Sequence, residues 1–328
     1  MVENNSGRRV AIACQGGGSH TAFTAGVLKK LLKDKEEHNY EVVALSGTSG
    51  GAICALLAWY GLLMNDTNKA IELLDSFWRD NSANSVQDRL LNDWLLWTNR
   101  FFENTGGAPT ISPYYLPSKG QDLLRSMLEK HVDFRRLQEL VGPSSSLLLI
   151  GAANVLSGEF KAFSSRRDRI SVDMILASAA IPTLFKAVHA DGGVYWDGLF
   201  SQNPPVRELP DAQPNEIWVI QINPETCKSE PKSVPQITDR RNELSGNLSL
   251  YQEIYFIKTV NKWVEEGSLS GTKHEVIDIK WIQMLRELDT ASKLNRDPSF
   301  IRGMMAYGEE QAEKFLKEQP ALVSGRTV

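Results

Sequence analysis

The chain has 328 residues, of which 42% are hydrophobic and 23% charged, and its formal net charge is −4. This composition excludes a disordered chain, a collagen-like repeat and a disulfide scaffold, and the mild acidity argues against a nucleic-acid partner. A chain of this length buries about three quarters of its unfolded surface, so it can form a large core. Because no repeat or low-complexity linker divides the sequence, we predict a single domain over residues 8–320, flanked by tails at 1–7 and 321–328.

The cysteines and the apolar segments indicate the cellular compartment of the protein. Cys14, Cys54 and Cys227 are widely spaced, unlike the paired cysteines of a metal site or a disulfide framework. The first nine residues lack the apolar stretch of a signal peptide. The most apolar segment, residues 52–64, is shorter than the roughly 20 residues that a membrane span requires. We therefore predict reduced thiols and a cytoplasmic protein whose contact with a membrane, if it makes one, is peripheral.

The first 64 residues contain the same pattern twice. Residues 9–14 form a β-rich run that ends at the glycine turn 16–18, and residues 22–32 follow with the apolar spacing of a helix. The second copy has a strand, a turn and a helix at residues 40–45, 46–51 and 52–64. Two strand–turn–helix units so close together predict a parallel sheet.

The rest of the chain continues with strands and helices, so we predict an α/β fold. Further strands are expected at residues 146–154, 159–163, 187–196, 216–222 and 276–281. Long amphipathic helices are expected at 237–266 and 299–317, and prolines mark loops at 204–205 and 210–214. In the first of these helices, Leu244, Leu248, Tyr251 and Tyr255 are expected to pack against the core.

The segment Gly47-Thr48-Ser49-Gly50-Gly51 carries the one Gly-x-Ser-x-Gly pattern of the chain. A predicted strand precedes it and a predicted helix follows it, which is the context in which such a serine stands on a sharp turn as a nucleophile. The N-terminus of the following helix offers N–H groups to a developing anion. Ser49 is therefore a candidate nucleophile, and the alternative is a tight turn with an incidental serine.

The glycine turn after the first strand can supply the oxyanion hole that such a nucleophile needs. Gly16, Gly17 and Gly18 are consecutive, so their backbone N–H groups can approach a substrate closely. A dinucleotide-binding turn is the alternative, but Thr21 occupies its third glycine position and no acidic residue closes the second strand.

Histidine is the usual base of a serine hydrolase, yet the histidines of this chain are poorly placed for that role. An α/β-hydrolase has several strands before its nucleophile and a histidine late in the chain. Here the candidate serine follows only two strands. The later histidines, His131, His189 and His274, do not lie at glycine-rich strand ends, so we expect them at the surface or within strands.

Two aspartates are better candidates for the base. Asp191-Gly192 lies between two apolar runs, which is typical of a hairpin turn and explains this aspartate structurally. Asp197 follows a predicted strand and precedes a glycine and a loop, where parallel-sheet enzymes hold side chains for chemistry. We therefore predict Asp197 as the base.

Four motifs in this order resemble those of the patatin-like phospholipase family, and the resemblance spans most of residues 9–222. They are the glycine turn 16–18, the serine turn 47–51, the segment Ala177-Ser178-Ala179-Ala180-Ile181-Pro182, and Asp197-Gly198 followed by Asn203-Pro204. The resemblance implies a three-layer α/β/α fold with a mostly parallel central sheet.

The same resemblance implies a function. The protein would be a lipid acyl hydrolase of the phospholipase A, lysophospholipase or esterase type, with Ser49 as nucleophile, Asp197 as base, and no metal or cofactor. The implied oxyanion donors are Gly16, Gly17, Gly18 and Gly50. The alternatives are an acyltransferase that uses the same acyl-serine and a lipid-binding module without catalysis.

The sequence departs from the family pattern at two places. His20 and Thr21 stand where the family has Arg-Gly, so His20 becomes the candidate contact for a substrate anion. Leu199 replaces the last glycine of Asp-Gly-Gly.

Bulky apolar residues gather within residues 86–116. In this segment Trp94, Trp97 and Phe101 could contact an acyl chain or form a lid. A core-facing helix is the favoured alternative.

Overall fold

The computed structural model describes residues 7–85, 88–90, 92–93, 112–115, 118–182, 184–286, 288 and 290–319. The strands are β1 (Arg8–Cys14), β2 (Tyr40–Thr48), β3 (Leu147–Asn154), β4 (Phe160–Ser164), β5 (Val188–Ala190), β6 (Gly193–Asp197), β7 (Glu216–Gln221) and β8 (Asp278–Gln283). The α-helices are α1 (Ala22–Asp34), α2 (Gly50–Leu63), α3 (Thr67–Asn81), α5 (Lys119–His131), α6 (Phe134–Leu140), α7 (Val172–Ser178), α8 (Val234–Glu265) and α9 (Pro298–Glu318). The 3-10 helices are η1 (Gly18–Thr21), η2 (Pro113–Tyr115), η3 (Gly198–Phe200), η4 (Leu209–Ala212) and η5 (Thr290–Leu294).

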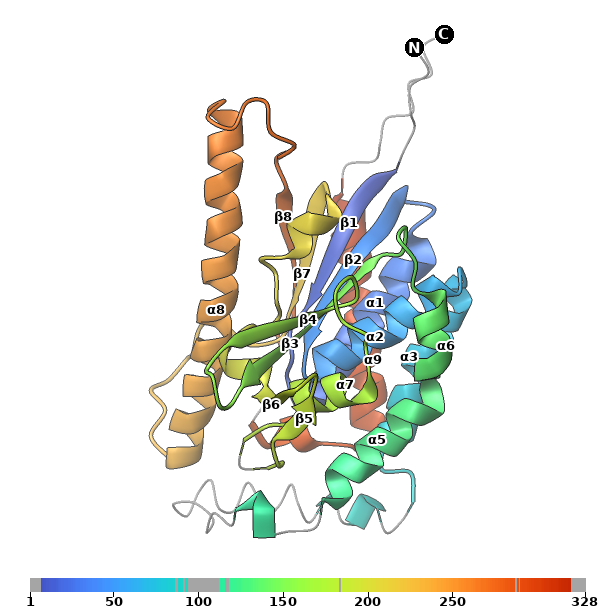
Figure 1. Ribbon diagram of the computed structural model, residues 1–328. Coiled ribbons are helices and arrows are strands. Elements are labelled where there is room, and N and C mark those ends of the chain that lie inside the picture. Colours follow the sequence, from blue (N-terminus) through green and yellow to red (C-terminus); the bar gives the residue numbers. More distant parts are fainter. Residues whose placement is uncertain are drawn as a thin grey trace.

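The described strands form one mixed sheet in the order β5-β6-β3-β2-β1-β7-β8, with β4 also paired to β3 (Figure 1). Strands β3, β2, β1, β7 and β8 are parallel to one another. Strands β4 and β6 run antiparallel to β3, and β5 runs antiparallel to β6. The mostly parallel sheet predicted from the sequence is confirmed. Its parallel order places the carboxyl ends of β1, β2 and β3 side by side, where the candidate residues lie.

The expected strand at 187–196 is instead a hairpin of β5 and β6. Its two-residue turn consists of Asp191 and Gly192, whose φ angles are 45° and 72°. Both values lie in the left-handed region that Asp-Gly hairpin turns require. The hairpin turn read at Asp191 is confirmed, and this turn separates Asp191 from the end of β6, where Asp197 lies.

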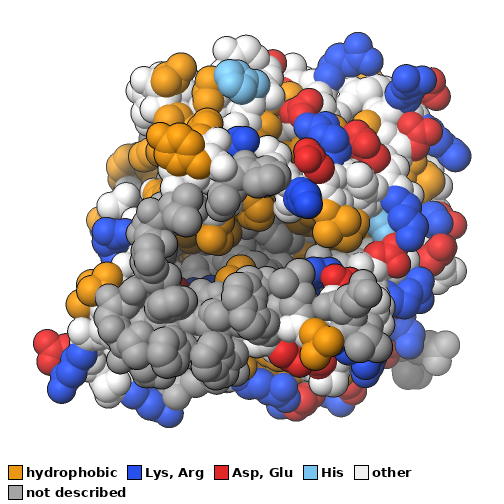
Figure 2. Space-filling view, turned by 90° about the horizontal axis from the view of Figure 1, so that it is seen from below, with side chains coloured by type: hydrophobic (Ala, Val, Ile, Leu, Met, Phe, Trp, Pro, Cys, Tyr) orange, Lys and Arg blue, Asp and Glu red, His pale blue; other side chains and the backbone are white. Residues whose placement is uncertain are grey.

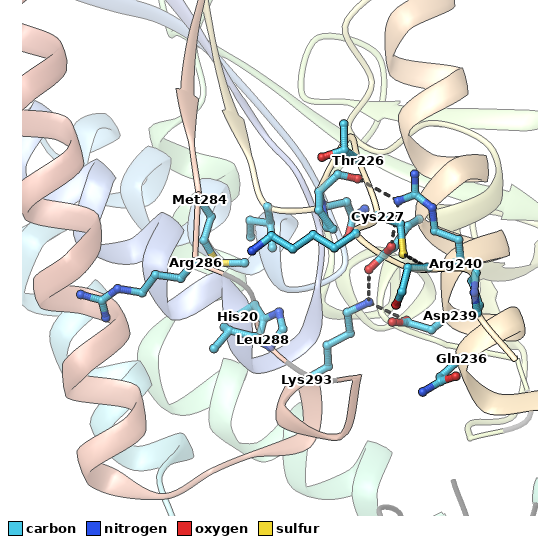
Figure 3. Close-up of a pocket in the computed structure, with 17 residues that line it drawn as sticks. His20, Thr226, Cys227, Gln236, Asp239, Arg240, Met284, Arg286, Leu288 and Lys293 are labelled. Carbon is cyan, nitrogen blue, oxygen red and sulfur yellow. Dashed lines mark hydrogen bonds and ion pairs between the residues drawn. The ribbon is translucent and has the colours of Figure 1, made fainter. Parts of the chain in front are cut away.

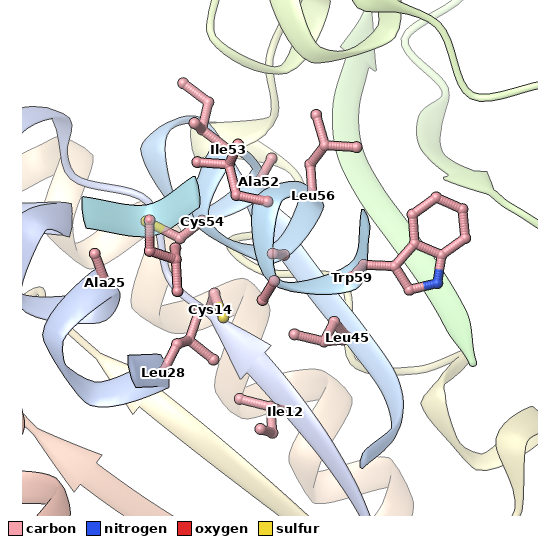
Figure 4. Packing of buried hydrophobic residues seen from close by; sticks show 14 of the residues in the cluster. Ile12, Cys14, Ala25, Leu28, Leu45, Ala52, Ile53, Cys54, Leu56 and Trp59 are labelled. Atoms are coloured by element: carbon pink, nitrogen blue, oxygen red, sulfur yellow. The ribbon is translucent and has the colours of Figure 1, made fainter. Parts of the chain in front are cut away.

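Helices cover both faces of the sheet, so the structure has three layers. Val10, Ile12 and Cys14 of β1 belong to the larger hydrophobic core, which also contains residues of α1, α2, α3 and α9. Figure 4 shows the part of this core where α1 and α2 pack on β1 and β2. Ala11 and Ala13 point the other way, into a smaller core that includes residues of α8. This alternation along one strand is what a sheet buried on both faces requires.

Helix α8 packs with a different face from the one predicted. Leu250, Ile254 and Ile257 are buried against the sheet. The expected contact residues Leu244, Leu248 and Tyr255 are 44%, 59% and 74% exposed, so that prediction is wrong. A helix repeats every 3.6 residues, and these two sets of residues therefore lie on opposite sides of the same helix.

The most apolar segment forms α2, which is buried over most of its length between the sheet and neighbouring helices. Within the described ranges, no helix combines the length and the apolar character that crossing a bilayer requires.

Candidate active site

Ser49 lies in the turn between β2 and α2, one residue after the strand ends and one residue before the helix begins. Its backbone angles are φ 56° and ψ −130°, a conformation that costs a non-glycine residue about 1–3 kcal/mol. The flanking glycines make the turn possible. A Cβ at residue 51 would lie 2.2 Å from the carbonyl oxygen of Cys14, and one at residue 47 would lie 2.4 Å from that of Gly51. The spacing Gly-x-Ser-x-Gly thus lets the chain reverse sharply and hold the serine at the end of the sheet.

Ser178, the last residue of α7, supports this turn through two hydrogen bonds. Its hydroxyl oxygen accepts the N–H of Ser49 at 3.0 Å and donates to the carbonyl oxygen of Gly151 at 2.7 Å. The side chain is fully buried. Ser178 therefore connects β3, α7 and the serine turn. Sequence reasoning missed this role, for which the only signal was the place of Ser178 in the motif of residues 177–182.

Asp197 ends β6 and reaches the same edge of the sheet. In the strand register Asp197 pairs with Ala152, while the neighbouring Gly151 pairs with Thr48. Asp197 is 1% exposed, and its Oδ1 accepts the N–H of Leu199 at 2.8 Å. Antiparallel β6 thus places this carboxylate two strands away from the serine turn.

The Asp197 carboxylate is also an unusually strong base for an aspartate. Burial raises its pKa from 3.8 to about 7, and hydrogen bonds from the Ser49 hydroxyl and the Leu199 N–H act in the opposite direction. The Ser49 hydroxyl therefore lies close enough to the Asp197 carboxylate to affect its pKa. A base whose pKa lies near the working pH is well suited to accept a proton.

Asp191 lies elsewhere. It occupies the exposed hairpin turn, where Oδ2 lies 3.3 Å from Nζ of Lys161. An exposed ion pair of this kind explains the residue without a catalytic role.

The glycine turn is held in place by Asn203 and Gln15. Oδ1 of Asn203 accepts the N–H of Gly16 at 2.7 Å. Oε1 of Gln15 accepts the N–H groups of Ile222 and Asn223, both at 2.8 Å. The prediction for Gly16 is therefore corrected: its N–H is already donated to Asn203, so Gly16 positions the loop and is not a free oxyanion donor.

The other three predicted oxyanion glycines, Gly17, Gly18 and Gly50, have backbone N–H groups available at the site. In the part of the chain that the structure describes, no acceptor takes the N–H of Gly17 or Gly18. Gly50 is the first residue of α2, and the first N–H groups of a helix have no partner within it. Gly18 has φ 57°, and a Cβ there would lie 2.4 Å from the carbonyl oxygen of Lys293. Only glycine therefore fits this contact.

Ser49, Asp197 and Gly16 to Gly18 line one cavity of about 400 Å³. The face of the molecule toward which the carboxyl ends of the parallel strands point is hollowed (Figure 2). One part of the cavity wall is apolar and consists of Ile181, Pro182, Leu184, Leu199, Phe200, Ala291 and Leu294. The polar part consists of Asn203, Asn223, Thr238, Asp239, Arg241, Asn242, Glu243 and Lys293. Residues of α8 and η5 thus complete a cavity whose reacting groups come from the first 200 residues, and sequence reasoning gave no sign of this.

His20, the expected contact for a substrate anion, does not line this cavity. It lines a neighbouring cavity of about 280 Å³, shown in Figure 3. Its Nε2 lies 2.7 Å from Oγ of Ser292, and its ring centroid lies 6.3 Å from that of Phe300. With 3% exposure, the ring is directed into the protein, toward η5 and α9.

The predicted acyl-chain or lid residues Trp94, Trp97 and Phe101 lie outside the described residues. Within 86–116 the structure describes only residues 88–90, 92–93 and 112–115.

Three comparisons with known proteins bear on this site. No curated protein sequence matches the chain. Among solved structures, VipD from Legionella pneumophila is 14% identical with a TM-score of 0.46, and the match covers 95% of this chain and 67% of VipD. The type III effector protein ExoU is 13% identical with a TM-score of 0.37, over 94% of this chain and 52% of ExoU. The complex of SpcU with ExoU from Pseudomonas aeruginosa gives 15% identity and a TM-score of 0.32, over 80% of this chain and 52% of that chain.

The comparison with protein families shows which family the chain belongs to. The family described as patatin-like phospholipase matches residues 12–210. This range contains the glycine turn, the serine turn, Ser178, Asp197 and Asn203, and it covers more than half of the 328 residues. The chain therefore belongs to the patatin-like phospholipase family.

Proposed function

We propose that this protein is a serine lipid acyl hydrolase that cleaves carboxylic esters with Ser49 as nucleophile and Asp197 as general base. One arrangement carries the proposal: a buried carboxylate, whose pKa burial raises to about 7, lines the same cavity as a serine on a strained turn. Membership of the patatin-like phospholipase family and the apolar part of the cavity wall favour an acyl ester as substrate.

The first step is acylation of the enzyme. Oγ of Ser49 attacks the ester carbonyl carbon while Asp197 accepts the hydroxyl proton, and a tetrahedral intermediate forms. Asp197 then gives this proton to the departing alcohol as the carbon–oxygen bond breaks, which leaves an acyl-Ser49. A carboxylate with an ordinary pKa of 3.8 would hold the proton too weakly for this transfer, and burial corrects the mismatch.

The oxyanion of the intermediate is stabilised by the N–H groups of Gly17 and Gly18, with that of Gly50 at the start of α2. One such donor contributes about 3 kcal/mol to the transition state. In the second step a water molecule gives a proton to Asp197 and its oxygen attacks the acyl carbon, which forms a second tetrahedral intermediate. Asp197 then gives this proton to Oγ of Ser49 as the acyl carbon–oxygen bond breaks, so the fatty acid leaves and both residues return to their starting state.

A labelling and turnover experiment tests this function. We expect the wild-type protein to hydrolyse p-nitrophenyl esters and lysophospholipid, and a fluorophosphonate probe to label Ser49. Ser49→Ala should lose both turnover and labelling, and Asp197→Asn should lose turnover, each in folded protein. Asp191→Asn is the matched control because it removes an aspartate of the same hairpin and should retain full activity. Full activity in Asp197→Asn, or labelling of Ser49→Ala at the wild-type level, would contradict the assignment.

A further inference from the structure

The glycine turn is packed against a segment from the far end of the chain. Gly18 lies directly on the backbone carbonyl of Lys293 in η5, as the 2.4 Å approach of a Cβ at residue 18 shows. Two residues after Gly18, His20 contacts the side chain of Ser292 at 2.7 Å. The 3-10 helix η1, which starts at Gly18, is thus in contact with two successive residues of η5.

The same η5 residue is anchored to α8 by ion pairs. Nζ of Lys293 lies 2.7 Å from Oδ1 of Asp239 and 3.6 Å from Oε1 of Glu243. Figure 3 shows Lys293 reaching from η5 toward Asp239 on α8. Glu243 is itself 3.1 Å from Arg240, one turn earlier on the same helix. Since the Lys293 side chain is only 23% exposed, these pairs are less screened by solvent than surface pairs.

Helix α8 holds the ion-pair partners of Lys293 in fixed positions. Its N-terminus carries a capping box formed by Ser233 and Gln236, and Leu250, Ile254 and Ile257 fix it to the sheet. A rigid helix therefore holds the Lys293 side chain, and the Lys293 backbone carbonyl supports Gly18. This connection joins a residue of the proposed oxyanion hole to elements more than 200 residues away in the sequence.

We propose that Lys293 is a positioning residue that holds the Gly18 N–H in place for the oxyanion through its ion pairs with Asp239 and Glu243. The inference rests on the proposed function, because Gly18 matters in this way only if Ser49 forms a tetrahedral intermediate. An oxyanion donor must be held to within about 0.5 Å of its working position, and it acts on the transition state and not on the bound ester. Removing the ion pairs of Lys293 should therefore lower kcat and leave KM nearly unchanged.

Lys293→Met tests this, since it removes the charged amine and keeps an unbranched side chain only one atom shorter. We expect kcat for a p-nitrophenyl ester to fall about tenfold, with KM within twofold of the wild type; complete loss of one oxyanion donor would cost 100-fold or more. The inhibition constant of an alkyl trifluoromethyl ketone, which forms a tetrahedral adduct on serine, should rise about tenfold as well. Binding of an alkyl ether of the same chain length should not change. Lys293→Arg keeps the ion pairs and should recover most of the lost kcat.

Lys29 provides a matched control. Its Nζ also bridges two carboxylates, Asp75 at 2.7 Å and Glu309 at 2.6 Å, and its side chain is 17% exposed. Lys29→Met should lose a comparable amount of stability in urea unfolding, yet retain kcat once the folded fraction is accounted for. A purely structural role for Lys293 would make the two variants behave alike.

The outcomes separate the two proposals. The inference is overturned if Lys293→Met keeps its kcat, if its KM rises while kcat is unchanged, or if Lys29→Met loses as much kcat per folded molecule. In each of those cases, labelled Ser49 and wild-type turnover would leave the proposed function standing. Absence of both labelling and turnover in the wild type would overturn the proposed function and this inference together.

Discussion

Replacing Asp197 with asparagine should stabilise the folded protein above pH 7 and at the same time abolish ester turnover. The carboxylate is buried, and its pKa is raised from 3.8 to about 7. One pKa unit corresponds to 1.36 kcal/mol, so the charged form of Asp197 destabilises the folded state by about 4 kcal/mol at pH 8. Asparagine has nearly the same shape and its side-chain oxygen can still accept the Leu199 N–H, so the substitution removes the charge without opening a cavity.

The sign of the pH dependence follows from the direction of the pKa change. The folded-state pKa lies above the unfolded-state value, so the folded protein binds this proton more tightly than the unfolded chain does. The contribution of Asp197 to stability is therefore most favourable below about pH 4, and it is lost as the pH rises to about 7. The stability difference between Asp197→Asn and the wild type should be close to zero at pH 4 and about 2–4 kcal/mol in favour of the variant at pH 8.

Urea unfolding followed by circular dichroism at pH 4, 6 and 8 measures this difference directly. Over the same range, kcat/KM of the wild type should rise with pH and level off above an apparent pKa of about 7, because the base acts in its deprotonated form. Asp191→Asn should change neither the stability profile nor the activity. If Asp197→Asn is less stable than the wild type at pH 8, or if the difference does not vary with pH, the description of Asp197 as a buried, partly charged base is refuted.

Two further substitutions test how the serine turn is built, and a third, in α9, serves as their control. Ser178→Ala removes the hydroxyl that accepts the Ser49 N–H, so kcat should fall about tenfold and stability by about 1–3 kcal/mol; unchanged kcat would show that the turn holds its shape unaided. Gly51→Ala places a Cβ 2.2 Å from the carbonyl oxygen of Cys14, and expression trials with urea unfolding should show a loss of more than about 3 kcal/mol. Gly303→Ala, in α9 with nothing within 4 Å of the new Cβ, should instead raise stability by about 0.5–1 kcal/mol in the same measurement; similar losses in both glycine variants would contradict the steric argument.

Much of the site was predictable because its signals are local. The strand before Ser49, the glycines around it and the helix after it follow one another within a few residues, and each reflects a steric requirement of the turn itself. The choice of Asp197 over Asp191 was also local, since an Asp-Gly between two apolar runs is a hairpin turn. The hairpin at Asp191 is confirmed, and Asp197 lines the same cavity as Ser49; the role of Asp197 as base stays a prediction.

Other features depended on which segments meet in space. The use of the Gly16 N–H by Asn203, the support of Ser49 by Ser178 and the direction of His20 toward Ser292 all join residues far apart in the sequence. No periodicity or local motif records such pairs, because the register between strands and the packing of helices decide them.

Helix α8 shows the same division within one element. Its sequence determined that a long helix forms, because the apolar spacing that predicts a helix over residues 237–266 is a local property; the observed helix is Val234–Glu265. Which side meets the sheet was decided by the fold, and Leu250 is buried there while Leu248 faces outward. The sequence by itself thus determined the main elements and the candidates for nucleophile and base, whereas only the tertiary structure decided that α8 and Lys293 complete the cavity around them. The physical reason is that local spacing fixes the shape of a segment, but the partners of a side chain are fixed by the packing of the whole chain.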